Sequence, residues 1–124
     1  MPLNVMTKEQ RIGVFLISPV GSLDSETFGI LEKTVDYILG NSPTEIVFDM
    51  EGVDYISSAG LRVIFKTKKA LDKNKGRVIL VHLQPAVKKV FDIVQALPSM
   101  TVFTSIQELD DYLDSMQRKV KEGE

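Results

Sequence analysis

Residues 49–61, with the sequence DMEGVDYISSAGL, decide how the middle of this chain folds. They follow the short apolar run at residues 46–48, which predicts a strand, and they carry a glycine in the turn that ends this strand. They then place Ser57 and Ser58 at the start of a helix that the apolar spacing predicts over residues 58–74. The segment is therefore a strand-to-helix connection that ends in two adjacent hydroxyl groups.

The two serines have two interpretations. A hydroxyl in the first turn of a helix lies beside unpaired backbone N–H groups and the positive end of the helix dipole, which favours an anion by about 0.3 to 1 kcal/mol. A phosphate on Ser58 is therefore compatible with the fold. Serine is also among the most favoured N-cap residues, for the same hydrogen-bonding reason. The residues alone leave capping and phosphorylation both open.

The composition is typical of one globular domain. The chain has 124 residues, of which 44% are hydrophobic and 26% are charged. Fifteen Lys and Arg against 17 Asp and Glu give a net charge of -2, which provides no general field for attracting nucleic acid or an anionic membrane. The absence of cysteine excludes disulfides and thiolate metal sites. No apolar run has the length of a signal-peptide core or a membrane span, so we expect a cytoplasmic protein without membrane insertion.

The amino-terminal residues predict a hairpin. Residues 12–17 form a nearly continuous apolar run that is typical of a buried strand, and Pro19 and Gly21 indicate a loop after it. Residues 3–6 can pair with this strand through a turn at residues 8–11. The first two strands are therefore expected to form an antiparallel pair at one edge of the sheet.

Three further segments have clear helical or strand patterns. Apolar side chains recur at helical spacing over residues 25–39, where Asp24 or Ser25 can cap the start of the helix. Residues 78–81 predict a strand, and Pro85 suits the first position of the helix that follows it. Strand and helix thus alternate along the chain.

The carboxy-terminal residues predict a brief strand and a last helix. The strand is expected at residues 102–103, and Ser105 and Glu108 form an S-x-x-E capping box after it. Apolar residues on one helical face continue from residue 106 to residue 120, and residues 121–124 are expected to be a frayed tail.

Alternation of strand and helix from residue 45 onward implies right-handed crossovers and a largely parallel sheet. We therefore predict an α/β fold: a single domain over residues 1–124, with a mixed, mostly parallel sheet of about five strands and about four helices. Functional loops of such sheets gather at the carboxyl ends of the strands. The loops at residues 21–27 and 52–60 are accordingly expected to be neighbours.

The motifs of enzymes and of nucleotide-binding proteins are incomplete or absent. A serine hydrolase needs G-x-S-x-G around its nucleophile, but Ile56 stands where the first glycine belongs. The single histidine, His82, closes a predicted strand, where a turn donor is commoner than a catalytic base. Neither glycine-rich phosphate-binding motif occurs. We therefore expect a protein that is not an enzyme and needs no cofactor.

Two groups of charged residues have both a functional and a structural interpretation. The acidic group could hold Mg²⁺ or accept a phosphoryl group, as in a receiver domain, but helix capping and turn formation explain it as well. The basic stripe could follow nucleic-acid phosphates, but it also suits a solvated helix face, and we expect no nucleic-acid binding. The acidic group is Asp24, Asp49, Glu51 and Asp54, and the basic stripe is Arg62, Lys66, Lys69 and Lys73.

Three stretches carry a family resemblance. GSLD at residues 21–24, followed by Thr27, is similar to a G-x-L-D loop; residues 47–61 are similar to a strand with a phosphorylation loop; and QPAVKKVFD at residues 84–92 is similar to a P-x-V-x-x-x-F-x helix. Together they resemble the STAS family, in particular its single-domain members, the anti-sigma factor antagonists of bacteria. The resemblance extends over about residues 3–120.

The resemblance implies a switch controlled by phosphorylation. The usual family loop reads Asp-Ser-[Ser/Thr/Ala]-Gly, and its serine, phosphorylated by an anti-sigma factor that is also a serine kinase, corresponds to Ser58. Ser57 replaces the family's aspartate and is a second candidate acceptor, whereas Gly60 and Leu61 match. The unphosphorylated protein would bind the kinase and free a sigma factor, and a serine phosphatase would reset the cycle. ATP is then expected on the partner kinase.

The same resemblance implies a partner-binding surface around the acceptor serine. Two alternatives to the switch remain: a STAS subunit of a transporter or stress-signalling assembly that no kinase modifies, and a small serine hydrolase that uses Ser58. The residues expected at the partner surface are Ser22, Asp24, Thr27, Tyr55, Ile56, Ser57, Gly60, Leu61 and Arg62.

Overall fold

The computed structural model describes residues 3–96 and 105–123 of the chain. Its sheet has the strand order β1-β2-β3-β5, with β4 paired to β2. Strands β1 (Asn4–Arg11) and β2 (Val14–Leu23) are antiparallel. Strands β3 (Glu45–Asp49) and β5 (Arg77–Val81) extend the sheet parallel to β2, and β4 (Val53–Ile56) pairs in parallel with the last residues of β2. The predicted mixed, mostly parallel sheet is confirmed.

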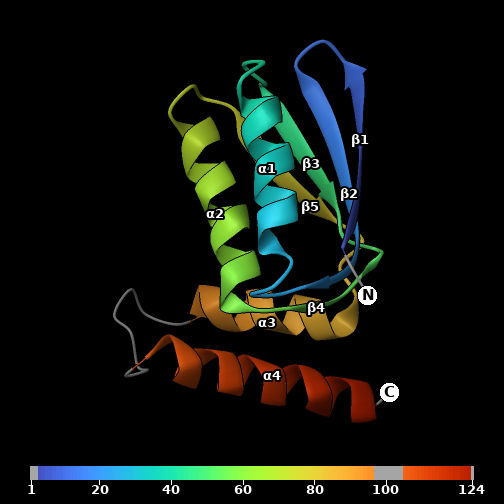
Figure 1. The fold of residues 1–124 in the computed structure, drawn as a ribbon, viewed down its shortest axis with the longest axis vertical. Coiled ribbons are helices and arrows are strands. Elements are labelled where there is room, and N and C mark those ends of the chain that lie inside the picture. Colours follow the sequence, from blue (N-terminus) through green and yellow to red (C-terminus); the bar gives the residue numbers. More distant parts are fainter. Residues whose placement is uncertain (1–2, 97–104, 124) are drawn as a thin grey trace.

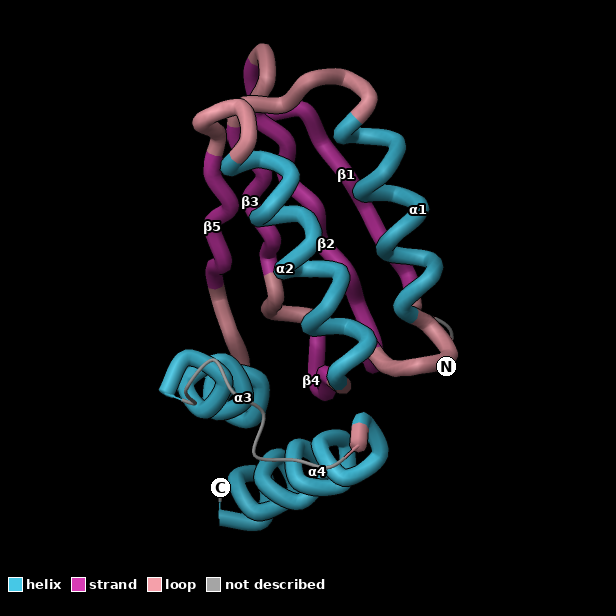
Figure 2. Tube along the Cα trace, turned by 90° about the vertical axis from the view of Figure 1, so that its left-hand side faces the viewer, coloured by secondary structure: helices cyan, strands magenta, loops and turns pink. Residues whose placement is uncertain are grey.

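Within the described residues, four helices cover one face and one end of this sheet. Helices α1 (Phe28–Leu39) and α2 (Ser58–Asp72) lie side by side over one face, as Figures 1 and 2 show. Helices α3 (Pro85–Ala96) and α4 (Ile106–Gly123) pack against each other across the end at which β2, β3 and β5 finish (Figure 1). Every helix predicted from the apolar spacing is therefore present, in an α/β fold.

The hydrophobic core lies between the sheet and helices α1 and α2 and continues toward α3 and α4. Alternate residues of β3, Ile46 and Phe48, are fully buried, because one face of the strand turns toward the helices. α1 contributes Leu31, Val35 and Ile38 at helical spacing, and α4 contributes Leu113, which is 1% exposed. The burial of Leu113 in this core holds α4 at the end of the sheet (Figure 1).

The amino-terminal hairpin corrects the sequence prediction. Its turn lies at residues 12–13 and not at residues 8–11, and Ile12, expected in the buried strand, is 96% exposed at the tip. Gly13 has a φ of +80°, a backbone conformation that glycine adopts without strain and other residues rarely adopt. The position of this glycine therefore determines where the turn lies. Strand β2 continues past Pro19 to Leu23, where the sequence predicted a loop.

The segment predicted as a loop at residues 52–60 contains strand β4. Val53 and Ile56 are fully buried, and Gly52 O accepts a hydrogen bond from Gly21 N at 2.9 Å. A side chain at Gly52 would have a Cβ 2.8 Å from Val20, so this glycine permits the close approach of the two strands. A four-residue strand that depends on such a tertiary contact leaves little local signal in the sequence.

Other differences concern the ends of the elements. α1 begins at Phe28, three residues later than predicted, and α4 extends to Gly123, so residues 121–123 of the expected frayed tail are helical. Ser105 Oγ accepts a hydrogen bond from Glu108 N at 3.1 Å, as the capping box predicts. The strand expected at residues 102–103 lies outside the described residues.

Candidate functional site at the amino terminus of α2

The two loops expected to be neighbours are joined by direct contacts. Ser22 and Leu23 at the end of β2 pair with Tyr55 and Ile56 of β4. Ser22 Oγ donates a hydrogen bond to Asp54 Oδ1 at 3.1 Å, and Ser57 N donates one to Leu23 O at 2.9 Å. The parallel sheet thus brings the start of α2 beside the loop that leads to α1, which confirms the prediction.

Asp24 orders the turn that leads into α1. Its Oδ1 accepts hydrogen bonds from Glu26 N at 2.9 Å and Thr27 N at 3.1 Å. Thr27 Oγ1 donates to Ser22 O at 2.7 Å and accepts from Asp24 N at 2.9 Å. The N-cap residue of α1 is Thr27, whereas the sequence analysis expected Asp24 or Ser25. Asp24 lies four residues before Phe28, the first residue of α1, and its side chain still satisfies two backbone N–H groups of the turn.

The serine pair differs from a normal helix cap. Ser57 is the N-cap residue of α2 and makes no capping hydrogen bond with its side chain, so the capping interpretation is not supported for either serine. The hydroxyl oxygens of Ser57 and Ser58 are both buried, and no described residue hydrogen-bonds to them. A buried hydroxyl without a partner costs free energy and calls for an explanation.

A residue of α4 occupies the position that a cap would take. Asp110 Oδ1 accepts a hydrogen bond from Ser58 N at 2.8 Å, so a carboxylate from the carboxy-terminal helix lies at the amino terminus of α2. This is a favourable place for a negative charge, because unpaired N–H groups and the helix dipole point toward it. The amino end of α2 therefore binds an anion already, although the anion comes from 52 residues away in the sequence.

A buried glutamine fastens α4 to strand β4. Gln117 is 1% exposed, its Oε1 accepts from Ile56 N at 3.0 Å, and its Nε2 donates to Ile56 O at 2.8 Å. The side-chain amide thereby pairs with Ile56 as a neighbouring strand would. Sequence reasoning missed this residue and Asp110. A signal existed, because Gln117 follows Leu113 by four residues on the apolar face of the predicted helix.

Five residues expected at the partner surface are inside the protein. Thr27 and Ser57 are buried polar residues, 9% and 4% exposed. Ile56 and Leu61 belong to the hydrophobic core, and Gly60 is buried at the first turn of α2. A Cβ at Gly60 would lie 2.7 Å from Leu23 Cγ and 2.9 Å from Ile56 Cγ1. In this conformation these residues shape and support the site, and they present no side chain to a partner.

The other four predicted residues are accessible: Arg62 is exposed, and Ser22, Asp24 and Tyr55 are half-buried. Asp54, which was not predicted at this surface, is exposed beside Ser22. Burial raises the pKa of the Tyr55 hydroxyl, and the carboxylates of Asp114, Asp110 and Asp24 raise it further in that order. Carboxylates from two separate parts of the chain thus surround Tyr55 beside the serine pair.

The other acidic residues at this end of the sheet have structural partners. Asp49 Oδ1 accepts from Glu51 N at 3.1 Å and lies 3.1 Å from His82 Nδ1. These contacts lower the pKa of Asp49, the backbone hydrogen bond most strongly. No group of three or more metal-ligating side chains occurs within the described residues. His82 thus pairs with Asp49, and no described base contacts the Ser58 hydroxyl, as a hydrolase would require.

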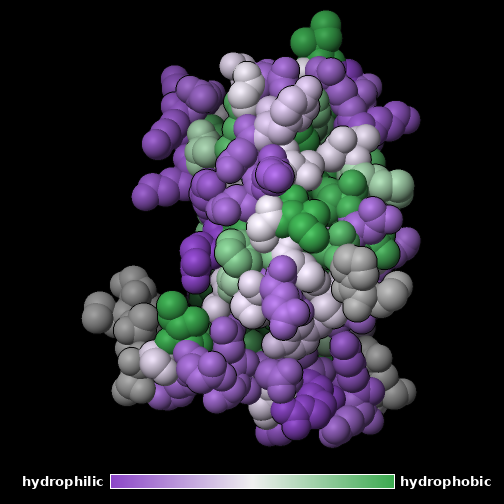
Figure 3. Space-filling view, in the orientation of Figure 1, coloured by the Kyte–Doolittle hydropathy of each residue, from purple (hydrophilic) through white to green (hydrophobic). Residues whose placement is uncertain are grey.

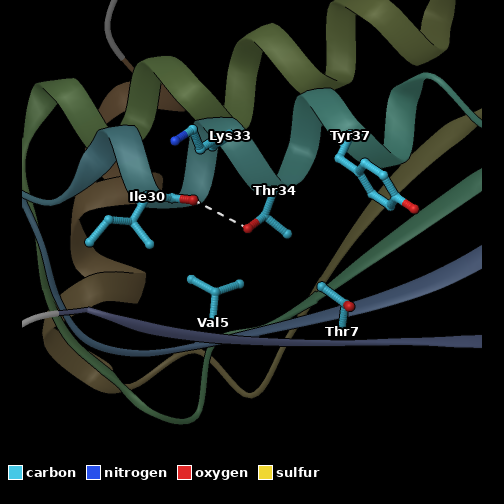
Figure 4. A pocket seen from close by; sticks show the side chains of 6 residues that line it. All are labelled: Val5, Thr7, Ile30, Lys33, Thr34 and Tyr37. Atoms are coloured by element: carbon cyan, nitrogen blue, oxygen red, sulfur yellow. Dashed lines mark hydrogen bonds between the residues drawn. The ribbon is translucent and has the colours of Figure 1, made fainter.

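Two other surface features do not join this site. Lys66 of the basic stripe pairs with Glu32 at 3.1 Å and Asp36 at 3.3 Å on α1, so it links the two helices. A shallow hollow between β1 and α1 is shown in Figure 4, and Thr34 Oγ1 donates there to Ile30 O at 3.2 Å. The residues that line the hollow are Val5, Thr7, Ile30, Lys33, Thr34 and Tyr37.

The fold and the serine loop can now be compared with known proteins. The STAS domain matches residues 5–109. This chain belongs to the STAS family. The resemblance inferred from residues 21–27, 47–61 and 84–92 is therefore confirmed. A relative from Bordetella bronchiseptica, BtrV, named as a candidate anti-sigma factor antagonist, is 32% identical over 88 residues, which cover 71% of this chain and 76% of BtrV.

Solved structures share the fold of this STAS domain. The anti-sigma factor antagonist SpoIIAA in its unphosphorylated form has a TM-score of 0.63 at 22% identity, over 88% of this chain and 97% of SpoIIAA. The phosphorylated form of SpoIIAA, from Bacillus, has a TM-score of 0.63 at 21% identity, over 88% of this chain and 99% of its own. Among the described residues of this STAS domain, no helix is both long and apolar enough to cross a membrane.

Proposed function

We propose that this STAS domain is an anti-sigma factor antagonist whose binding is switched off by phosphorylation of Ser58. The observation that supports the proposal best is the position of the Ser58 hydroxyl at the amino end of α2, where no described residue hydrogen-bonds to it. A hydroxyl that satisfies no structural hydrogen bond is free to serve another purpose. The relative BtrV, named as a candidate antagonist of this class, supports the same function.

The partner is an anti-sigma factor that is also a serine kinase and that carries the ATP. In the transfer, the Ser58 hydroxyl oxygen bonds to the γ-phosphorus, the bond to ADP breaks, and the hydroxyl proton passes to a base of the kinase. A serine phosphatase hydrolyses the phosphoester and restores the binding form. The STAS domain itself is a binding module in the cytoplasm and catalyses neither step.

Electrostatic repulsion explains how one phosphate would end the complex. A phosphoserine adds about -1.5 to -2 charges at neutral pH. Beside Ser58 the chain already presents Asp24, Asp54 and Asp110, so the modified surface would be strongly negative. A partner that fits the uncharged serine would have to desolvate this charge, whereas the start of α2 tolerates it within the fold. Arg62, one turn further along α2, offsets part of the charge.

The proposal is tested with two variants of the acceptor and one of its neighbour. Ser58→Ala should stay in the binding form in the presence of kinase and ATP, and Ser58→Asp should bind at least about tenfold more weakly, because a charge then faces the partner. Ser57→Ala is the matched control and should still be switched by ATP, since we assign the acceptor to Ser58.

Affinity capture from the native cell lysate, with and without ATP, identifies the partner, and titration calorimetry then measures each variant. Equal affinities of Ser58→Ala and Ser58→Asp for that partner would contradict the proposed switch. Phosphate found on residue 57 alone would move the acceptor to Ser57. If a partner is captured but neither serine is phosphorylated, the result would favour a STAS subunit that no kinase regulates.

A further inference from the structure

Helix α4 lies at the amino end of α2 (Figure 2), where its Asp110 accepts a hydrogen bond from Ser58 N. We infer that α4 is an internal strap that keeps the Ser58 hydroxyl closed to other proteins, and that Asp110 holds the anion position a phosphate on Ser58 would take. This inference deepens the proposed function and rests on it for its biological meaning. Its physical content, the closing of residue 58 by α4, stands on contacts within this chain.

Among the described residues of α4, Asp110, Leu113 and Gln117 contribute to the closing contacts. Asp110 accepts a hydrogen bond from Ser58 N at 2.8 Å, and Gln117 makes two hydrogen bonds to the backbone of Ile56, at 3.0 and 2.8 Å. Leu113 lies between them in sequence and is 1% exposed. The outer surface of the molecule at α4 is largely hydrophilic, as Figure 3 shows. The inward face of α4, which also packs against α3, therefore holds a helix whose outer surface is solvated.

With α4 bonded to Ser58 N through Asp110, the strap implies that access to the hydroxyl requires movement of this helix. The Ser58 oxygen has almost no solvent-accessible surface, and Ser57 is 4% exposed. Phosphoryl transfer needs the attacking oxygen in line with the bond that breaks, with the nucleotide of the kinase directly opposite. A kinase cannot reach a buried oxygen in this way. The phosphorylated state must therefore pass through an arrangement in which α4 has moved away from residue 58.

Asp110 and a phosphate on Ser58 compete for the same place. Each is an anion that is stabilised by the N–H groups at the start of α2, and the Ser58 N–H is already used by Asp110. Like charges at such short range repel each other. Phosphorylation should therefore displace Asp110 and loosen α4, so that the modification changes the surface over α4 as well as the loop itself.

Opening also exposes a strand edge that a partner can use. Ile56 N and O are bonded by the Gln117 amide, so release of α4 frees one donor and one acceptor on the outer edge of β4. A partner that displaces α4 must offer a carboxylate to α2 and an amide or peptide group to Ile56, because an unsatisfied polar group would oppose binding. A partner must therefore displace α4, and a phosphate on Ser58 would occupy the position of the partner's carboxylate, so the modified protein does not bind although α4 is loosened.

The test uses the absence of cysteine from the chain. Ser58→Cys introduces one thiol beneath α4, and its rate of reaction with 5,5′-dithiobis(2-nitrobenzoate) measures how often residue 58 opens. A separate variant, Thr67→Cys, reports global unfolding, since Thr67 is fully buried further along α2. Each reporter is combined with Gln117→Leu, which releases the strap without changing the charge, and with Gln107→Leu, an exposed control on the same helix.

The thiol at position 58 should react at least about tenfold more slowly than in the urea-unfolded chain, and Gln117→Leu should accelerate it about tenfold by removing two hydrogen bonds to Ile56. The Thr67→Cys reporter and the Gln107→Leu control should not change. Asp110→Ala should act like Gln117→Leu, with Asp111→Ala as its control.

Three results would overturn the strap. These are unprotected labelling at position 58, equal rates in Gln117→Leu and Gln107→Leu, and equal acceleration of both thiols, which would mean that α4 leaves only when the whole domain unfolds. The labelling involves no kinase, so its outcome is independent of the proposed phosphorylation. Protected labelling with an unphosphorylated Ser58 would keep the strap and refute the switch.

Discussion

Gly60→Ala tests whether this position of the serine loop is set by packing. Gly60 lies in the first turn of α2 with an ordinary helical backbone, so the substitution itself introduces no unfavourable φ. The added Cβ would lie 2.7 Å from Leu23 Cγ, 2.9 Å from Ile56 Cγ1 and 3.0 Å from Leu23 O. Carbon atoms pack best at about 3.5 to 4.0 Å, so the two carbon contacts are too close. Leu23 and Ile56 are fully buried and cannot easily move away.

The expected magnitude follows from two opposing terms. Overpacking of a well-packed site costs about 1 to 3 kcal/mol. Replacing a helical glycine with alanine gains about 0.5 to 1 kcal/mol. Gly29 provides the matched control, because it also lies in a helix and nothing approaches its Cβ position within 4 Å. The propensity gain is common to both variants, so their difference isolates the packing cost.

We therefore expect Gly29→Ala to raise the free energy of unfolding and Gly60→Ala to lower it, with a difference of about 1 to 3 kcal/mol between them. Urea titration followed by far-ultraviolet circular dichroism measures both, and unchanged slopes show that the comparison is between the same two states. Equal stability of the two variants would refute the packing argument. Loss of partner binding by Gly60→Ala without loss of stability would make Gly60 a contact residue instead.

Three further predictions concern charged residues. Asp49 has a lowered pKa in the folded chain. Its contribution to the free energy of unfolding is therefore complete above pH about 4 and is lost as the pH falls through the lowered pKa. Asp49→Asn should weaken the dependence of the urea midpoint on acid pH. Lys66→Met should change the free energy of unfolding by less than about 1 kcal/mol in the same titration, because the Lys66 side chain is 47% exposed. Asp24→Ala removes hydrogen bonds to Glu26 N and Thr27 N and should lower the free energy of unfolding by about 1 to 2 kcal/mol. If partner affinity falls only in proportion to the fraction of folded protein, Asp24 has a structural role alone.

Local patterns determined much of the fold and of the site. Apolar spacing located the helices, since a periodic stripe along α1 or α4 must be buried against something. Alternation of strand and helix implied that β2, β3 and β5 run parallel, because a helix that crosses the sheet returns the chain to the same end. The carboxyl ends of parallel strands lie at one edge, which placed the loops at residues 21–27 and 52–60 side by side. The serine pair at the start of α2 was also evident from the sequence.

Only the tertiary structure decided what lies against those serines. Asp110 and Gln117 reach residues 58 and 56 from more than 50 positions away, and nothing in a helical pattern states which backbone group a side chain will meet. Strand β4 forms because β2 supplies its partner, and Gly60 is needed because Leu23 and Ile56 pack against it. Periodicity records which face of an element is buried, whereas the contact that buries it depends on the packing of the whole chain.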